Sequence, residues 1–152
     1  MVNYTPAVMG KSESSSQSNS GHRVREFMTL NFQTISRNQT ILGASEMLID
    51  LDLTGAPVVD EHGAMIGFLS EKDCLKYVLD AKYYNHAPSS VTHYMSTQVM
   101  SISPNDNLTH VVELFLRNNY QIYPVLEEGR VIGTVSRKTI LKAVSDLNEA
   151  SW

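Results

Sequence analysis

The sequence predicts a mixed α/β fold of the α+β class, made of two β-α-β-β-α repeats that pack through their sheets about a pseudo-twofold axis. Three observations predict this fold. The chain resembles itself at an offset of 67 residues. Each copy shows helical and strand-like hydrophobic patterns in the same order. A copy of about 55 residues forms only a marginal core alone, so two copies are expected to bury their sheets against each other.

The internal match is long and needs a single deletion. Val24–Met28 aligns with Val91–Met95, and Ala56–Asp60 aligns with Tyr123–Glu127. Dropping one residue near His62 then keeps the copies in register through their last helices. A match of this length indicates a duplicated structural unit.

The match and the composition divide the chain into five parts. The predicted parts are a flexible serine-rich tail at 1–22, repeat one at 23–80, a polar linker at 81–90, repeat two at 91–147 and a C-terminal tail at 148–152. The last helix is expected to extend into this C-terminal tail before it frays.

The first half of each repeat predicts a short strand and then a helix. In repeat one, the residues after Ile35 include several that favour a helix N-cap. Apolar residues follow at helical spacing in both copies: Ile41, Ala44, Leu48 and Leu51, then Leu108, Val111, Val112 and Phe115.

The second half of each repeat predicts a β-hairpin and a closing helix. The turns contain Gly63 and Gly129, because a short hairpin commonly needs a positive φ that glycine adopts freely. Apolar residues line the closing helices: Leu75, Val78 and Leu79, then Ile140, Leu141 and Val144. These faces fit either the internal core or a dimer interface.

The second strand of each hairpin turns directly into the closing helix. Repeat one has Gly67-Phe-Leu-Ser-Glu-Lys-Asp73, and repeat two has Gly133-Thr-Val-Ser-Arg-Lys-Thr139. Ser70 and Asp73 have the spacing of a capping box. The same geometry presents helix N–H groups to an anion and a carboxylate to the hydroxyls of a ribose. Ser70 and Asp73 therefore fit either a helix cap alone or a helix cap that also binds a ligand.

Two such repeats resemble tandem CBS domains, the arrangement called a Bateman module. The resemblance rests on the methionines that end each opening segment, on Pro57-Val58 and Pro124-Val125, and on the Gly67–Asp73 motif. It covers roughly four-fifths of the chain. It implies regulatory binding of an adenosine-containing ligand (AMP, ADP, ATP or S-adenosylmethionine) in the cleft between the repeats, with no required cofactor and no catalysis.

The resemblance also implies site residues. It maps the ribose acceptor onto Asp73, the phosphate-side hydroxyl onto Ser70, and the adenine contacts onto Thr34, Ile35, Thr54, Gly55 and Ala56. The wider candidate set adds Pro57, Lys72, Ser101, Ile102, Tyr120, Ile122, Tyr123, Arg130, Ser136, Arg137, Lys138 and Thr139. Tyr120 and Tyr123 fit either base stacking or simple packing.

Repeat two departs from the motif because Thr139 stands where repeat one has Asp73. Threonine brings no charge and a shorter reach, which puts a normal ribose contact there in doubt. Residues 24–78 carry four basic and eight acidic side chains, whereas residues 91–144 carry five and four. Our main hypothesis is one nucleotide, with its ribose on Asp73 and its phosphates on basic groups of repeat two. One nucleotide per repeat, or an empty second repeat, are the alternatives.

The module is then expected to signal to an unidentified effector protein and to form a homodimer. The competing function is a dimerisation or scaffold module with degenerate pockets, which the Thr139 substitution favours. We expect no metal site, because the five histidines lack ligand spacing, and no nucleotide-binding loop of the G-x-x-x-x-G-K type is present.

The composition is that of a globular domain that binds neither nucleic acid nor membrane. The 152 residues are 42% hydrophobic and 18% charged, with a net charge of −4, which argues against a nucleic-acid surface. No apolar run approaches the roughly 20 residues that span a bilayer, and the sequence shows no signal peptide. The single cysteine, Cys74, excludes an internal disulfide and fits a reducing compartment, so a cytoplasmic location is expected.

Overall fold

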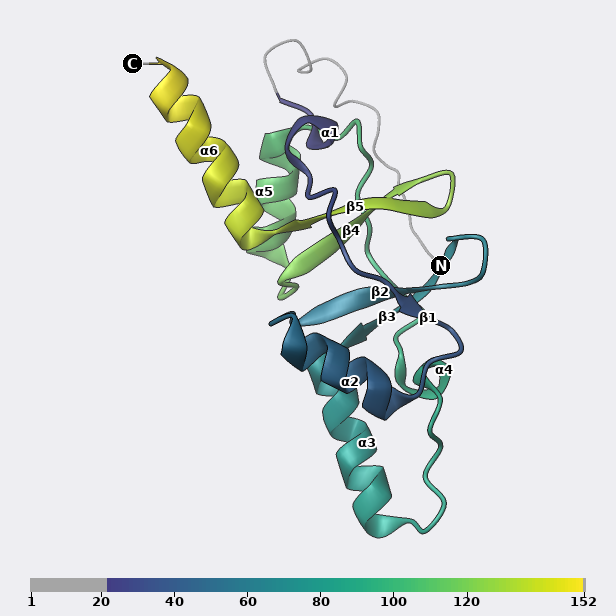
Figure 1. The fold of residues 1–152 in the computed structure, drawn as a ribbon. Coiled ribbons are helices and arrows are strands. Elements are labelled where there is room, and N and C mark those ends of the chain that lie inside the picture. Colours follow the sequence, from purple (N-terminus) through teal and green to yellow (C-terminus); the bar gives the residue numbers. More distant parts are fainter. Residues whose placement is uncertain (1–21, 152) are drawn as a thin grey trace. The chain divides into compact units, whose positions relative to one another are not determined.

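The computed structural model describes residues 22–151, so the predicted serine-rich tail lies almost wholly outside the described residues. The described chain forms two compact units (Figure 1). Unit 1 consists of residues 33–99, and unit 2 combines residues 22–32 with residues 100–151.

Unit 1 contains a three-stranded sheet in the order β1-β2-β3, with β1 parallel and β3 antiparallel to β2. Its elements are β1 (Ile35–Ser36), α2 (Ile41–Asp50), β2 (Gly55–Val59), β3 (Met65–Ser70), α3 (Glu71–Tyr83) and α4 (Val91–Tyr94). Helices α2 and α3 lie side by side (Figure 1). The core consists of Ile35, Ile41, Ala44, Leu48, Ala56, Val58, Leu69, Val91 and Tyr94. This order confirms the predicted β-α-β-β-α pattern.

Thr40 shows why α2 begins at Ile41. Its hydroxyl accepts a hydrogen bond from the backbone N–H of Gly43, which satisfies one of the free donors of the first turn. Helix α2 ends at Asp50, so Leu51 lies just beyond the helix and is exposed, although its spacing predicted a core position.

Unit 2 repeats this arrangement with a shorter first strand. Its elements are α1 (Val24–Phe27), α5 (Leu108–Arg117), β4 (Ile122–Glu127), β5 (Arg130–Ser136) and α6 (Arg137–Ser151). Ile102 forms a single parallel bridge to Val125, at the position where Ile35 of β1 pairs with Val58 in unit 1. Helix α6 continues to Ser151, into the range expected to be a C-terminal tail.

The compact units differ from the sequence repeats, because the opening segment of each repeat folds into the other repeat's unit. Helix α1 opens repeat one but belongs to unit 2, where the backbone N–H of Val24 donates to Asp106 O (2.8 Å). Helix α4 opens repeat two but belongs to unit 1, where the N–H of Val91 donates to Gln39 O (3.2 Å). Both valines are fully buried, so these openings are core elements.

Each opening segment then pairs with the last strand of its unit. In unit 1, Ser96 and Phe68 exchange two backbone hydrogen bonds of 2.9 Å. In unit 2, Thr29 and Thr134 exchange bonds of 2.8 and 3.1 Å. The segment therefore lies alongside the strand that leads into the closing helix, and its side chains are neighbours of the candidate site.

Candidate functional site: two strand-to-helix junctions

The junction between β3 and α3 forms a complete capping box in unit 1. The Asp73 Oδ2 atom accepts hydrogen bonds from Ser70 N (2.9 Å) and Ser70 Oγ (3.0 Å), while Asp73 N donates to Ser70 Oγ (3.2 Å). Glu71 adds a second acid to the first turn of α3. Both acids complement the positive end of the helix dipole.

The other carboxylate oxygen of Asp73 is less occupied. Within residues 22–151, its Oδ1 atom has one hydrogen-bond partner, Lys76 Nζ, at the long distance of 3.5 Å. The Asp73 residue is 8% exposed, whereas the Lys76 side chain is 63% exposed. Asp73 is therefore a buried carboxylate whose Oδ1 atom keeps capacity to accept hydrogen bonds from hydroxyl groups. Sequence reasoning missed Lys76, and its place three residues after Asp73 on a helix was the available signal.

The start of β2 lies beside this junction. Gly55 is the strand partner of Ser70, and Thr54 O accepts a hydrogen bond from Glu71 N (3.0 Å). The structure therefore brings the expected adenine contacts Thr54 and Gly55 next to Ser70. Thr34 is partly exposed, whereas Ile35, Ala56 and Pro57 are buried in the fold of unit 1 and offer mainly backbone groups.

An aromatic ring that sequence reasoning missed lies on the same face as Ser70. Phe68 precedes Ser70 by two residues on β3, so their side chains share one face of the strand. Its ring leans over Gly55, where an added Cβ atom would be 2.6 Å from Phe68 Cε1. The ring is partly exposed. Unit 1 thus places an aromatic surface and a carboxylate together.

Burial also acts on the residue next to Asp73. It raises the pKa of the Cys74 thiol, with a smaller raising effect from the charge of Asp73. Cys74 is therefore a neutral, partly buried side chain at neutral pH and not an activated nucleophile.

The corresponding junction of unit 2 contains only hydroxyl groups. The Ser136 N and Thr139 Oγ1 atoms are 3.3 Å apart, as are Thr139 N and Ser136 Oγ. The two hydroxyls lie 3.1 Å from each other. The distances are longer than those in the capping box of unit 1, and the side chains carry no charge. Thr134 takes the place of Phe68, so neither the aromatic ring nor the carboxylate is retained.

The basic candidates of unit 2 separate in the structure. Arg137 and Lys138 begin α6 and are exposed, and Arg137 Nη2 donates to Tyr120 O (3.4 Å). Arg130 begins β5 at the hairpin turn, roughly 20 Å along the strand from Ser136. The structure therefore does not bring Arg130 to the junction. Lys72 is exposed on the first turn of α3 in unit 1.

The two candidate tyrosines have different surroundings. Tyr123 is fully buried, its ring lies 4.7 Å from that of Phe115, and its hydroxyl donates to Leu114 O (3.0 Å). Burial raises the pKa of Tyr123. Tyr120 is 44% exposed and contacts Tyr123 edge-on at 5.5 Å. These contacts describe a packing role for Tyr123.

The remaining candidates of unit 2 follow its strands. Ile102 is buried in the core, Ser101 before it is exposed, and Ile122 is the strand partner of Ser136. Within residues 22–151, no three His, Cys, Asp or Glu side chains group around a possible metal position. In the same range, no helix has both the length and the apolar character needed to cross a membrane.

A family model described as CBS domain matches residues 24–80 and 91–146. Among curated proteins, the chain is 29% identical over 119 residues to the uncharacterized protein MJ1225 of Methanocaldococcus jannaschii, covering 78% of this chain and 41% of that protein. It is 27% identical over 124 residues to the A-adding tRNA nucleotidyltransferase of Aquifex aeolicus, covering 82% and 14%. The chain thus spans less than half the length of either relative.

Solved structures share the fold at low sequence identity. CBSX2, a protein of Arabidopsis thaliana solved in complex with AMP, superposes with a TM-score of 0.75 at 24% identity, over 84% of this chain and 99% of that one. The CBS domain pair of protein MJ0100, solved with 5′-methylthioadenosine and S-adenosyl-L-methionine, gives 0.70 at 23%, over 84% and 98%. A putative acetoin utilization protein of Vibrio cholerae gives 0.76 at 21%, over 86% and 96%.

Proposed function

The chain belongs to the CBS-domain family, with two copies of the domain in tandem, and from this premise we propose that it is a regulatory module that binds an adenosine-containing ligand through unit 1. The ligand class is AMP, ADP, ATP or S-adenosylmethionine. Binding then favours one conformation of the module, which an effector protein reads. No cofactor and no catalytic step are part of this proposal.

The observation that carries the proposal is the state of the Asp73 carboxylate. Its Oδ2 atom accepts hydrogen bonds from Ser70, whereas the hydrogen-bond partner of Oδ1 within residues 22–151 is Lys76 Nζ, at 3.5 Å. A ribose hydroxyl that donates to Oδ1 gains a charge-assisted hydrogen bond without breaking the cap. The ring of Phe68 offers an apolar surface for adenine on the same strand. The ligands of CBSX2 and of MJ0100 are consistent with this chemistry.

The experiment must separate ligand binding from helix capping, because Asp73 does both. In Asp73→Asn, the amide oxygen still accepts from Ser70 N, but the charge is lost. We expect AMP to bind about 10- to 100-fold more weakly to this variant, with little change in the Tm of the free protein. Calorimetry with AMP, ADP, ATP, S-adenosylmethionine and GMP measures the affinities.

Glu71→Gln is the matched control, because it removes the same charge from the same helical turn at an exposed position. It should bind AMP within about twofold of the wild type. Phe68→Leu should weaken AMP binding by about 1 kcal/mol if the ring contacts the base. Equal AMP affinity of Asp73→Asn and the wild type would contradict the ribose role.

A second candidate function, dimerisation, is favoured by the exposed apolar side chains of the closing helices. Leu75 is 63% and Leu79 58% exposed on α3, and Leu141 is 68% exposed on α6. These residues are therefore not internal core, which leaves the interface alternative. We propose that they bury against a second copy of the chain.

Light scattering tests this candidate. The double variant Leu75→Glu, Leu79→Glu should halve the measured mass. Leu116→Glu changes a leucine on α5 that is even more exposed, and it should leave the mass at that of the dimer. A wild type that is monomeric at high concentration would remove this candidate and leave the ligand proposal untouched.

A further inference from the structure

The methionine of each opening segment packs against bare backbone. In unit 1, the Sδ and Cγ atoms of Met95 would lie 2.5 and 2.8 Å from a Cβ atom on Gly67. In unit 2, the Sδ and Cγ atoms of Met28 would lie 2.7 and 3.0 Å from a Cβ atom on Gly133. Each thioether therefore fills the space that a side chain on the glycine would take, and the contact occurs in both units.

These methionines are the accessible part of their segments. Val24 and Val91, which begin the two helices, are fully buried, whereas Met28 and Met95 are partly exposed. Each methionine also packs against the core cluster of its own unit. A small oxidant in the solvent can therefore reach a side chain that helps to fix the segment on its core.

A sulfoxide would be unfavourable in this contact. Oxidation adds a polar oxygen atom to the sulfur and makes an apolar side chain polar. The neighbouring N–H groups of Phe68 and Ser96 already donate to each other's carbonyl oxygens. Those of Thr29 and Thr134 do the same in unit 2. The new oxygen would therefore be an acceptor that these groups cannot satisfy, which costs free energy where it is shielded from water.

We propose that Met95 and Met28 are reversible modification sites, at which hydrogen peroxide forms a sulfoxide that releases the opening segment from its unit. The sulfur uses a lone pair to form an S–O bond with one peroxide oxygen. The O–O bond breaks, and the second oxygen leaves as water with both protons. The sulfur is oxidised and the peroxide is reduced. A dithiol-dependent reductase reverses the step, with formation of a disulfide and water. This proposal does not depend on ligand binding to unit 1.

Peroxide treatment of the full chain tests the proposal, with peptide mass spectrometry to show which methionines gain oxygen. The oxidised wild type should have a Tm at least about 5 °C lower. The double variant Met28→Leu, Met95→Leu keeps a similar apolar volume, and peroxide should change its Tm by less than about 2 °C. This variant retains Met47, Met65 and Cys74, so the comparison subtracts the effect of their oxidation.

The single variants Met95→Leu and Met28→Leu are controls for each other, with amide hydrogen exchange as the measurement. After peroxide treatment of Met95→Leu, the Thr29 amide should exchange at least about tenfold faster, while the Ser96 amide keeps its protection. Met28→Leu should show the reverse. Treatment with methionine sulfoxide reductases should restore protection in both variants.

Met95→Gln tests the same effect without peroxide, because glutamine places a polar group on a side chain of similar length. It should speed exchange of the Ser96 amide about tenfold. Met100→Gln is the matched control. Met100 is 39% exposed and is not among the described residues that pack on either core cluster, so its replacement should change Ser96 exchange by less than about twofold.

Three results would overturn the proposal. The first is peroxide that oxidises Met100 but leaves Met28 and Met95 unmodified. The second is sulfoxides at these two positions with unchanged exchange of the Thr29 and Ser96 amides. The third is a double variant that loses as much Tm as the wild type. Removal of the sulfoxides by the reductases without recovery of amide protection would refute the reversible role.

Discussion

The sulfur of Met95 lies against the backbone of Gly67, where a Cβ atom would be 2.5 Å from it. Unit 2 has the same contact between Met28 and Gly133, at 2.7 Å. The methionine of each opening segment therefore packs on a glycine of the last strand. This contact explains why both glycines open the strand-to-helix motif, at positions where φ is not positive.

We expect Gly67→Ala to destabilise unit 1 by about 1–3 kcal/mol. The added methyl group would meet the flexible Met95 side chain and also the backbone oxygen of Ser96, at 2.8 Å. Ser96 is held by two hydrogen bonds to Phe68, so its backbone cannot move easily. Gly133→Ala should cost less, because the Thr29 oxygen is 3.1 Å away. Urea unfolding gives both values, and a larger loss in Gly133→Ala would contradict this reasoning.

The hydroxyl of Tyr94 donates to Asp80 Oδ2 at 3.0 Å and ties α4 to α3. Tyr94→Phe should lower the free energy of unfolding by about 1 kcal/mol. Burial, and then the bond to Asp80, raise the pKa of Tyr94. Its contribution is therefore complete below the ordinary tyrosine pKa of about 10 and is lost as pH rises through the folded-state pKa. Tyr94→Phe should remove that alkaline loss, whereas the exposed Tyr83→Phe should keep it.

The carboxylate of Asp60 organises the first hairpin turn. Its Oδ1 atom accepts from the N–H groups of His62 (2.9 Å) and Ala64 (3.0 Å). The bond from His62 is the largest cause of a lowered Asp60 pKa, and burial opposes it. The stabilisation is present above the ordinary pKa of about 3.9 and disappears as pH falls through the folded-state pKa.

Asp60→Asn should therefore flatten the acid limb of a plot of Tm against pH, while its amide oxygen keeps the turn formed at pH 7. Asp50→Asn, an exposed aspartate at the end of α2, is the comparison. An acid limb that stays as steep in Asp60→Asn as in the wild type would refute the assignment.

The second hairpin turn is less well matched to its residues. Glu128 has a φ of 54° and Gly129 a φ of 80°, so both adopt a left-handed conformation. Asparagine tolerates this conformation better than glutamate, and we expect Glu128→Asn to stabilise the protein by about 0.5–1 kcal/mol. Glu61→Asn in the first turn should give no gain, because positive φ there falls on Gly63. Thermal unfolding of both variants decides the point.

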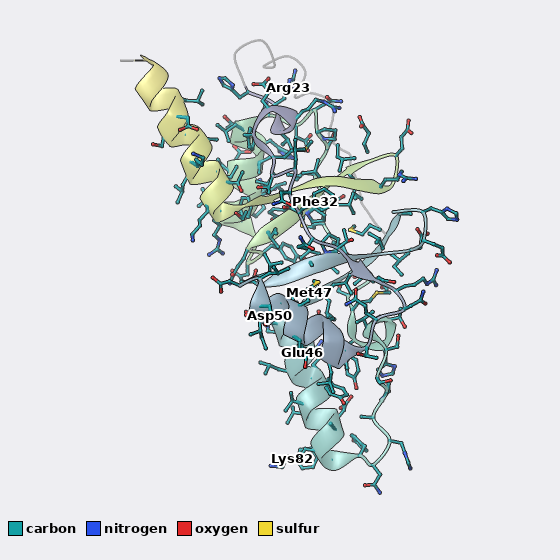
Figure 2. All side chains as sticks on the ribbon, in the orientation of Figure 1. Arg23, Phe32, Glu46, Met47, Asp50 and Lys82 are labelled. Carbon is teal, nitrogen blue, oxygen red and sulfur yellow. The ribbon has the colours of Figure 1, made fainter. Side chains whose placement is uncertain are left out.

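Periodicity and duplication were sufficient to predict the hairpin and the two longer helices of each repeat, but not the short opening helices α1 and α4. Ile41, Ala44 and Leu48 are buried as their spacing predicted, and the Ser70–Asp73 capping box is present. These features depend on residues close in sequence. The exchange of opening segments depends on contacts between residues far apart in the sequence, such as Arg23 (labelled in Figure 2) with Asn105 and Val91 with Gln39, and no local pattern reports such contacts.

The same limit applies to the candidate site. The Asp73 and Thr139 difference was visible from the alignment of the two copies. The burial of Leu75, which is exposed, and of Tyr123, which is buried, could not be predicted. Apolar stripes and aromatic residues show the same sequence pattern in a core and at an interface.

Unit 1 is continuous in the sequence and unit 2 is not, and this difference affects folding during synthesis on the ribosome. Unit 1 is one uninterrupted stretch, so all its parts have left the exit tunnel soon after residue 99 is made. Unit 2 combines residues 22–32 with residues 100–151. Its first segment is therefore made before the rest of unit 2 exists, and all of unit 1 is made in between. Folding of unit 1 before unit 2 is complete would shorten the effective loop that unit 2 has to close. The two units are therefore expected to fold in a set order during synthesis, with unit 1 before unit 2.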